Sequence, residues 1–367
     1  MSKRIIFVIT GLGLGGAEKQ ICLLADKLYL HNNEVNIVVL NGNVNVTPLN
    51  ENIRIHNLHM KKNPLGLLNA VLRLVKIISY FKPDIVHGHM FHANIVARLA
   101  KVFTYNKYKL ICTAHSKNEG GHIRMLVYRL TDFLCDATTN VSNEALDVFI
   151  KKKAFSKSKS IPVYNGIDTD LFKYDPLQRD KIRHSLNIIN DDSLILSVGR
   201  LTDAKDYPNL LKALLELPER YKLVIIGEGE ARNEVERTIL NYGLEKRVKL
   251  LGSIANVATY YSACDIYVSS SKWEGFGLVV AEAMSCQRLV VATNAGGVAE
   301  VVGDMNYIVP VSDPQLLANK INEVMEFDHE TKMEVMYRNR EFVLKMFSID
   351  MIVNQWMKLY SSILSIA

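Results

Sequence analysis

The sequence has few of the features that define several large classes of protein. It contains only five cysteines in 367 residues, scattered along the chain without metal-ligand spacing. This pattern favours reduced, mostly buried thiols in a cytosolic protein over a disulfide scaffold. No stretch reaches the roughly 20 apolar residues that span a bilayer. The N-terminal apolar run meets glycine early and lacks the cleavage site of a signal peptide, so we expect a buried strand there.

Internal repeats, low-complexity segments and the signatures of nucleic-acid-binding modules are also missing. Few aromatic residues interleave with the basic ones, so we expect no nucleic-acid partner. Acidic residues are scarce in the first half, where residues 1–175 carry 23 Lys and Arg against 13 Asp and Glu. A basic half of this kind indicates an anionic partner such as a membrane surface with acidic lipid.

What the chain does have is a regular alternation of strand-like and helix-like segments. This alternation is typical of α/β domains with parallel sheets and crossover helices. Strands are expected at 4–10, 34–40, 53–58, 84–89, 109–115, 137–142 and 160–165, and then at 194–199, 222–227, 248–252, 266–270, 289–293 and 307–310. Two such sets exceed one sheet, so we predict two Rossmann-like domains.

The predicted domains are 1–175 and 176–345, followed by a helix over 346–367. The boundary is placed in the polar stretch 173–192. The last helix follows the completed second sheet, and we expect it to pack back on the first domain. Because ligands of open α/β sheets bind at the carboxyl ends of the strands, we expect a site in a cleft between two facing domains.

The first motif is a glycine loop after the first predicted strand. Gly11, Gly13 and Gly16 satisfy the dinucleotide pattern G-x-G-x-x-G. A dinucleotide site also needs an acidic residue at the end of the second strand, where this chain has Asn41. We therefore reject a dinucleotide and retain the pair Gly15 and Gly16, whose amides can approach a phosphate at a helix N-terminus.

The second domain offers charged residues just past its strand ends. Arg200 and Lys205 suit a diphosphate, with an ordinary solvated basic loop as the alternative. Farther on, Glu274 precedes a glycine-flanked turn and Glu282 lies in the apolar helix that follows. The turn can aim the amides of three residues at an anion: Phe276, Gly277 and Leu278. An exposed loop acid is the alternative for Glu274, whereas a lone Glu282 in an apolar helix needs a partner.

Together the motifs GLGGAE, TAHS, YNGID, VGRL with a following lysine, GEGE and EGFGLVVAEAM resemble glycosyltransferase family 4. These are retaining nucleotide-sugar transferases of the GT-B fold, many of the bacterial polysaccharide or O-antigen type. The resemblance covers almost the whole chain, in the family's order. It implies catalytic roles for His115, Glu274, Arg200 and Lys205. It also implies a donor site that comprises Gly15, Gly16, Asn165, Gly199, Arg200, Lys205, Ile254, Glu274, Phe276, Gly277, Leu278 and Glu282.

Two positions depart from the family pattern, and two patterns mimic metal sites. The family usually has glycine at the positions of Asp206 and Gln287. Asp168 and Asp170 form a D-x-D, but turn chemistry explains it. Of three nearby histidines, His89 and His92 are expected near the acceptor rather than on zinc, because no Cys or carboxylate joins them at ligand spacing. We expect no metal and no cofactor beyond the nucleotide-sugar substrate.

The sequence therefore predicts transfer of a hexose or N-acetylhexosamine from a nucleotide sugar to a glycan or polyprenyl-diphosphate-linked acceptor. UDP is the expected nucleotide and GDP the alternative. A nucleotide-sugar 2-epimerase of the same fold and a non-catalytic binding protein are the rival hypotheses. The expected location is cytoplasmic and peripheral, on the inner face of the cell membrane. Docking to anionic lipid is expected through the apolar, basic segment 61–82.

Overall fold

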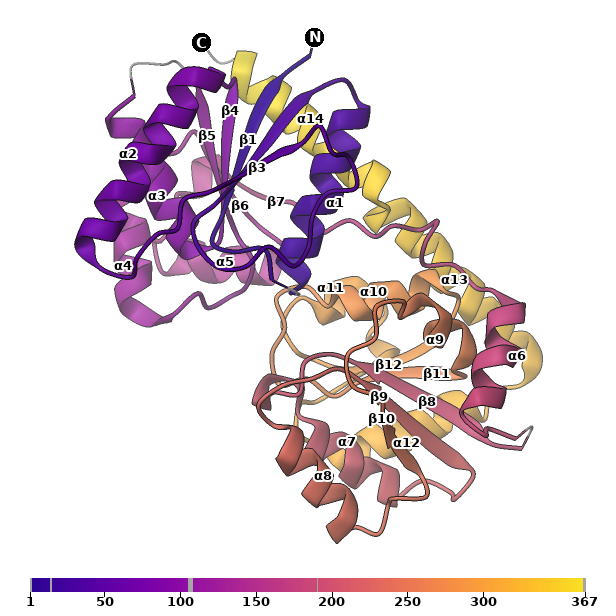
Figure 1. Ribbon diagram of the computed structural model, residues 1–367. Coiled ribbons are helices and arrows are strands. Elements are labelled where there is room, and N and C mark those ends of the chain that lie inside the picture. Colours follow the sequence, from indigo (N-terminus) through magenta and orange to yellow (C-terminus); the bar gives the residue numbers. More distant parts are fainter. Residues whose placement is uncertain (1, 14, 105–107, 190, 366–367) are drawn as a thin grey trace. The chain divides into compact units, whose positions relative to one another are not determined.

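The computed structural model describes residues 2–13, 15–104, 108–189 and 191–365 (Figure 1). The chain forms two compact units, Met1–Gly166 with Ile349–Ala367, and Ile167–Ser348. The first segment of the N-terminal unit ends at residue 166, nine residues before the predicted boundary at 175. Residue 167 already belongs to the second unit. There the Ile167 amide donates to the Phe347 carbonyl at 2.7 Å, and Ile167 forms a parallel bridge with Ser348.

Each unit is built on a parallel sheet, in the strand orders β3-β2-β1-β4-β5-β6-β7 and β10-β9-β8-β11-β12-β13. Every predicted strand is present. The bounds in the first unit are β1 Arg4–Ile9, β2 Glu34–Val39, β3 Arg54–Asn57, β4 Ile85–His89, β5 Lys109–Ala114, β6 Ala137–Asn140 and β7 Ser160–Pro162. In the second they are β8 Ser193–Val198, β9 Tyr221–Ile226, β10 Val248–Leu250, β11 Ile266–Ser269, β12 Leu289–Thr293 and β13 Ile308–Val309.

Helices cover both faces of the first sheet (Figure 1). One layer contains α1 and the C-terminal helix α14, and the other contains α2 and α3. The bounds are α1 Gly16–Leu30, α2 Pro64–Phe81, α3 Phe91–Val102, α4 Gly121–Thr131, α5 Asn143–Lys151 and α14 Ile349–Ser365, with short 3₁₀ turns η1 Asp132–Leu134 and η2 Lys157–Lys159. Helix α14 buries Ile352, Val353, Trp356 and Tyr360 against this sheet. The prediction that the last helix returns to the N-terminal unit is confirmed.

The second sheet is covered in the same way, with α7, α8 and α12 on one side and α9, α10 and α13 on the other (Figure 1). The bounds are α6 Pro176–Ser185, η3 Asp203–Lys205, α7 Tyr207–Leu215, α8 Arg232–Asn241, α9 Ala258–Ala263, α10 Leu278–Ser285, α11 Val298–Val302, η4 Met305–Tyr307, α12 Pro314–Met325 and α13 His329–Phe347. All five cysteines are buried and free, as their scattered spacing predicted.

The strand orders locate the functional ends of both sheets. In each unit the order reverses beside the first strand, between β1 and β4 and between β8 and β11. Ligands of doubly wound sheets bind outside the carboxyl ends of the strands at such a reversal. The loops after β1, β4, β8 and β11 are therefore where substrate-binding side chains are expected.

Candidate active site

Two loops meet at the strand-order reversal of the second unit, and an ion pair joins them. Lys205, at the end of η3, lies beyond β8, and its ammonium pairs with Glu274 Oε1, which lies beyond β11. Ser271 Oγ donates to the same oxygen at 2.8 Å. Both charged side chains are less than one fifth exposed. Two residues that the sequence placed in the site are thus brought into direct contact.

Glycines allow this contact to form. A Cβ at Gly199 would lie 2.7 Å from Lys205 Cε, so glycine at this position leaves room for the lysine side chain in its present conformation. Gly296 has φ +66°, and a Cβ there would lie 2.2 Å from the Glu274 carbonyl oxygen. This backbone-to-backbone approach excludes any larger residue. The position of Glu274 is therefore fixed by two neighbouring loops as well as by its own ion pair.

Arg200 differs from Lys205 in its surroundings. It follows Gly199 directly, is exposed, and has no ion-pair or side-chain hydrogen-bond partner within the described part of the chain. Lys205 is already balanced by Glu274. The uncompensated positive charge at this end of the sheet is therefore on Arg200, where an anionic ligand can meet it.

The N-terminus of α10 supplies the second attraction for an anion. Its N-cap, Gly277, has φ +99°, a conformation that favours glycine. Among the described residues, the amides of Gly277, Leu278 and Val279 have no hydrogen-bond acceptor. The Phe276 ring lies in the core against Phe347, so this residue can offer a ligand only its backbone. Free amides and the helix dipole favour an anion at this end.

Glu282 lies one turn into α10 and is half-buried. Its Oε2 accepts a hydrogen bond from the Tyr261 hydroxyl at 2.7 Å. The buried Tyr261 comes from α9, and burial next to Glu282 raises its pKa well above the usual value, so this hydroxyl stays a donor. A lone carboxylate in an apolar helix needs a polar partner, and Tyr261 is one such partner of Glu282. Ile254 lies in the half-exposed loop after β10.

Both departures from the family pattern occupy left-handed backbone conformations. Asp206 has φ 48° and Gln287 has φ 55°, which explains why glycine is usual at these positions. The Asp206 carboxylate is buried, accepts from Ser312 Oγ at 2.8 Å, and lies 3.7 Å from the Lys272 ammonium. Its charge is therefore balanced by other residues, and it is not directed at Lys205.

In the first unit, buried histidines gather behind His115. His115 follows β5, and its Nε2 lies 3.1 Å from Nδ1 of His89, the last residue of β4. His89 is 2% exposed and contacts the rings of Phe7 and His87. Burial lowers the pKa of His115 to about 4 and that of His89 well below its usual value. Both rings are therefore neutral near pH 7, and His89 supports His115 from behind.

His92 lies elsewhere, exposed on the first turn of α3, with its ring against Phe91. Within the residues that the structure describes, it has no contact with His89 or His115, so the two predicted acceptor histidines are not brought together. The proposal that they bind acceptor stays a prediction, and the burial of His89 favours a positioning role over direct contact.

Glu119 is a site residue that the sequence argument missed. Its Oε1 accepts from the His115 amide at 2.9 Å, and its Oε2 accepts from the Tyr128 hydroxyl at 2.6 Å. Burial raises the pKa of Glu119 above its usual value. The sequence feature that points to Glu119 is its place as a lone acid in a basic region, four residues after His115 and directly before two glycines. Glu119 thus holds the loop that carries His115.

The glycine loop also contains an acid that the sequence argument did not use. Helix α1 begins at Gly16 with Gly15 as N-cap. A Cβ on Gly15 would lie 2.3 Å from Glu18 Oε2, so this carboxylate lies against the loop. Any phosphate that approaches Gly15 or Gly16 meets Glu18 as well as the amides. Asn165, the remaining donor residue predicted in this unit, is buried just after β7.

The Asp168 and Asp170 pair is a turn. Asp168 Oδ1 accepts from the amides of Asp170 and Leu171 at 3.2 and 3.0 Å. Among the described residues, no group of three or more His, Cys, Asp or Glu side chains is arranged to hold a metal. The hydrogen bonds of Asp168 explain this motif, as its turn chemistry predicted.

Comparison with known proteins identifies the class. Residues 14–171 match the family model described as Glycosyltransferase Family 4, and residues 178–342 match the model described as Glycosyl transferases group 1. The chain belongs to these glycosyltransferases and has the GT-B fold. It is therefore an enzyme of the glycosyltransferase class, as its motifs predicted.

Particular relatives are distant but cover most of the chain. The chain is 28% identical over 358 residues to N-acetylgalactosamine-N,N'-diacetylbacillosaminyl-diphospho-undecaprenol 4-alpha-N-acetylgalactosaminyltransferase of Campylobacter jejuni, which covers 93% of this chain and 94% of the relative. It is 28% identical over 297 residues to N-acetyl-alpha-D-glucosaminyl L-malate synthase of Bacillus anthracis, covering 77% and 75%. Among solved structures, Anabaena HepE in complex with UDP-glucose has TM-score 0.85 and 25% identity, covering 98% of this chain and 100% of HepE.

Proposed function

We propose that this enzyme transfers a hexose or N-acetylhexosamine from a UDP-sugar to a polyprenyl-diphosphate-linked glycan, with retention of anomeric configuration and without a metal. The name of the Campylobacter relative describes transfer of N-acetylgalactosamine to a diphospho-undecaprenol-linked acceptor. HepE, which shares the fold, binds UDP-glucose. The proposed process is the synthesis of cell-surface polysaccharide, including lipopolysaccharide O-antigen.

One observation supports the donor assignment. At the strand-order reversal of the second unit lie the Arg200 cation and the first amides of α10, which have no partner among the described residues. When the anomeric bond breaks, negative charge grows on the departing diphosphate. The α10 amides are fixed by the helix before the reaction, and preorganised dipoles of this kind are usually the largest catalytic contribution. Arg200 adds an unbalanced positive charge at the same end of the sheet. These groups supply charge stabilisation from the protein itself.

The two carboxylates take different parts in this proposal. Glu282, fixed by Tyr261, accepts a hydrogen bond from the ribose of the nucleotide. Glu274 uses one oxygen for Lys205 and Ser271. Its other oxygen has no partner among the described residues and accepts from a hydroxyl of the donor sugar. Lys205 then acts mainly by orienting Glu274, and it contacts the diphosphate only if that pair opens.

His115 completes the proposed chemistry in the first unit. Its Nε2 is engaged by His89, which leaves Nδ1 as the ring nitrogen that can meet a sugar hydroxyl. A neutral imidazole in this position binds the sugar without repelling the positive charge that develops at the anomeric carbon. Attack by the acceptor on the face that the diphosphate leaves retains the anomeric configuration.

The second part of the proposal is that the enzyme docks to anionic lipid at the inner face of the cell membrane. Helix α2 takes part in this docking, but through other residues than the whole of its predicted apolar face. The apolar face predicted on this helix comprises Leu67, Leu68, Val71, Leu74, Val75 and Ile78. Val71, Leu74 and Ile78 are buried on the sheet and Leu67 and Val75 are partly buried, whereas Leu68 is exposed together with Leu65 and Leu72. Among the described residues, α2 alone is long and apolar enough to span a bilayer. Its buried face, however, makes it a crossover helix of the core.

Helix α4 adds a second exposed apolar stripe that the sequence argument missed. Ile123, Leu126 and Leu130 recur along one face, and Phe133 in η1 continues it. Helix α3 contacts both α2 and α4 (Figure 1). None of the three helices contains Asp or Glu. An apolar surface that lacks negative charge, with basic residues on α2 and α4, suits an anionic bilayer.

Arg200→Ala and Glu282→Ala test the donor site. Each should lower transfer from the nucleotide sugar by about 10²-fold or more, the scale of losing one preorganised charge contact. Arg237→Ala, on the exposed face of α8, is the matched control and should leave the rate unchanged. Near-normal turnover of both folded site variants would refute the donor assignment.

A further inference from the structure

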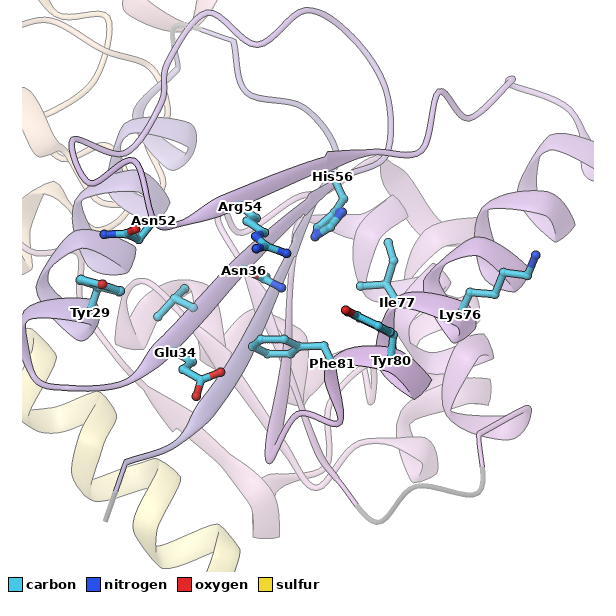
Figure 2. A pocket seen from close by; sticks show the side chains of 11 residues that line it. Tyr29, Glu34, Asn36, Asn52, Arg54, His56, Lys76, Ile77, Tyr80 and Phe81 are labelled. Carbon is cyan, nitrogen blue, oxygen red and sulfur yellow. The ribbon is translucent and has the colours of Figure 1, made fainter.

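A hollow of about 470 Å³ lies at the open edge of the first sheet, between β3 and the C-terminal end of α2 (Figure 2). Its volume falls within the range of small-ligand sites, about 300–1,000 Å³. It lies near the amino ends of β2 and β3, whereas His89 is the last residue of β4 and His115 follows the carboxyl end of β5. At about 3.3 Å per residue and 4.8 Å per strand, the two places are on the order of 15 Å apart. Its lining includes Asn36 of β2, Arg54 and His56 of β3, and Lys76, Ile77, Tyr80 and Phe81 of α2.

The floor of the hollow is polar where the sheet would ordinarily be apolar. Asn36 is on β2 and faces the α2 side of the sheet, as Val38 and Leu40 do farther along. It is only 8% exposed, and its amide has no hydrogen-bond partner among the described residues. Figure 2 shows the Asn36 side chain directed into the hollow, toward Arg54.

Arg54 and His56 of β3 extend this polar floor. Arg54 lies opposite Asn36 in the sheet, and its guanidinium has no acidic partner in the described part of the chain. His56 Nε2 is buried without a hydrogen-bond partner. The one acid in the lining, Glu34, is paired with Arg4 at 3.5 Å. The hollow therefore presents hydrogen-bonding groups and two positive charges, on Arg54 and Lys76, that have no acidic partner among the described residues.

The α2 side of the hollow is aromatic. Tyr80 is 86% exposed and offers its ring to a ligand. Phe81 lies across from Asn36 (Figure 2), and the Arg4 guanidinium covers one face of its ring, 4.6 Å from the centroid. The negative face of an aromatic ring attracts the C–H groups of a ring packed on it, and a pyranose offers such a face together with hydroxyls for Asn36 and His56. A carboxylate or phosphate on that sugar would meet Arg54.

We infer that this hollow is a second glycan-binding site, which takes a sugar residue that bears a carboxylate or a phosphate. The choice of a glycan rests on the proposed function, because a transferase that extends a glycan also meets the sugars next to the one it extends. The site would hold part of the acceptor away from the reacting end. None of its lining residues belongs to the donor or acceptor set described above.

Methyl-group NMR of the full chain tests this inference without any turnover. The Ile77 methyl signal should shift saturably with glucuronate or with glucose 6-phosphate. Glucose alone, and inorganic phosphate alone, should each bind at least about tenfold more weakly, because glucose lacks the anionic group and phosphate lacks the sugar ring. UDP, added separately, should shift the Ile254 methyl instead, so the donor proposal is judged on a different signal.

Variants make the result specific. Arg54→Gln should weaken binding of the acidic sugar by about tenfold or more, since it removes a charge-assisted hydrogen bond. Asn36→Val should also weaken binding, because it removes the amide that meets a sugar hydroxyl. Lys152→Gln, an exposed charge outside the hollow, is the control and should leave binding unchanged. Three results would overturn the inference: no saturable Ile77 shift with either acidic sugar, equal affinity for phosphate alone, or binding unchanged by Arg54→Gln.

Discussion

The ion pair between Lys205 and Glu274 joins two loops of the second unit and also belongs to the proposed catalytic site. The pair is mostly buried and shares Ser271 as a third member. Removing either partner leaves the other as an uncompensated charge in a site with little water, which is costlier than losing the attraction alone. The pair therefore acts as a unit, and its members should not contribute independently to catalysis.

A double-mutant cycle measures this coupling. Lys205→Met and Glu274→Gln should each reduce kcat/KM by about 10²-fold, and the double variant should lose far less than the product of the two. The expected coupling is about 1–3 kcal/mol, the range found for residues in one charged network. Strictly additive losses would show that Lys205 meets the diphosphate directly and that its pair with Glu274 is incidental.

His115 links the site to the pH dependence of stability. Burial lowers its pKa to about 4, whereas an unfolded histidine titrates near 6.5. Between these values the unfolded chain binds a proton that the folded chain does not, so stability falls as pH drops from 6.5 toward 4. Buried His87 and His89 act in the same direction.

Urea denaturation between pH 4.5 and 7 checks this expectation. The free energy of unfolding should decline toward acid by up to about 1.4 kcal/mol per pH unit for each such group. His115→Gln should remove one group's share of that slope. A slope that is the same in this variant and in the parent would mean that His115 is solvated in solution.

Gln287 stands where the family usually has glycine, and the sequence alone gives no physical reason for that preference. The family pattern marked this position, and the structure supplies the cause, a φ of 55° at the end of α10. A β-branched residue tolerates this conformation poorly. Gln287→Val should therefore lose about 1–2 kcal/mol of stability in urea denaturation, whereas Gln287→Gly should lose little or gain. Equal losses in the two variants would place the cause in packing.

Among the elements, α2 and α4 divide their apolar residues between core and surface. One face of α2 is packed on the sheet, and its other face is exposed along with the Ile123, Leu126 and Leu130 stripe of α4. Solvent-exposed leucines on two helices that both contact α3 and contain no acids form an apolar surface that water disfavours. The proposed membrane docking would give this surface a function, and it requires no spanning segment.

Liposome co-sedimentation tests the docking surface. The enzyme should bind vesicles with anionic lipid and detach as salt rises, because each basic residue near the surface contributes about 1 kcal/mol through a screened attraction. Replacing Leu68 and Leu130 with Gln should weaken binding, and Leu240→Gln on α8 should not. Equal binding to neutral and anionic vesicles, or no binding at low salt, would refute docking.

The elements themselves could largely be predicted, since local periodicity specifies strands and crossover helices. The sequence also placed Arg200 and Glu274 just past strand ends and Glu282 in the helix that follows, because the chain order of an α/β fold determines which loops share an edge. It could not predict that His89 is buried behind His115, or that Glu119 holds the His115 loop. Those contacts depend on side-chain packing between separate strands and loops, and no spacing in the sequence encodes them.

Across the full chain, each unit carries a distinct half of the proposed reaction. The second unit holds the cation, the helix amides and the two carboxylates for the donor. The first unit holds His115, its supporting histidines and the basic, apolar helices suited to a lipid-linked acceptor. The division at Gly166 and Ile349 keeps these sets in separate compact bodies, so donor binding and acceptor binding can be measured one at a time.

The most direct test of transferase function is incubation of the purified chain with UDP-sugars, with and without a polyprenyl-diphosphate-linked glycan. Mass spectrometry should show the acceptor gaining one hexose or N-acetylhexosamine only when both substrates are present. NMR of the product should show the donor's anomeric configuration. A sugar epimerised in the absence of acceptor would contradict this account, and so would UDP-sugar binding without any transfer.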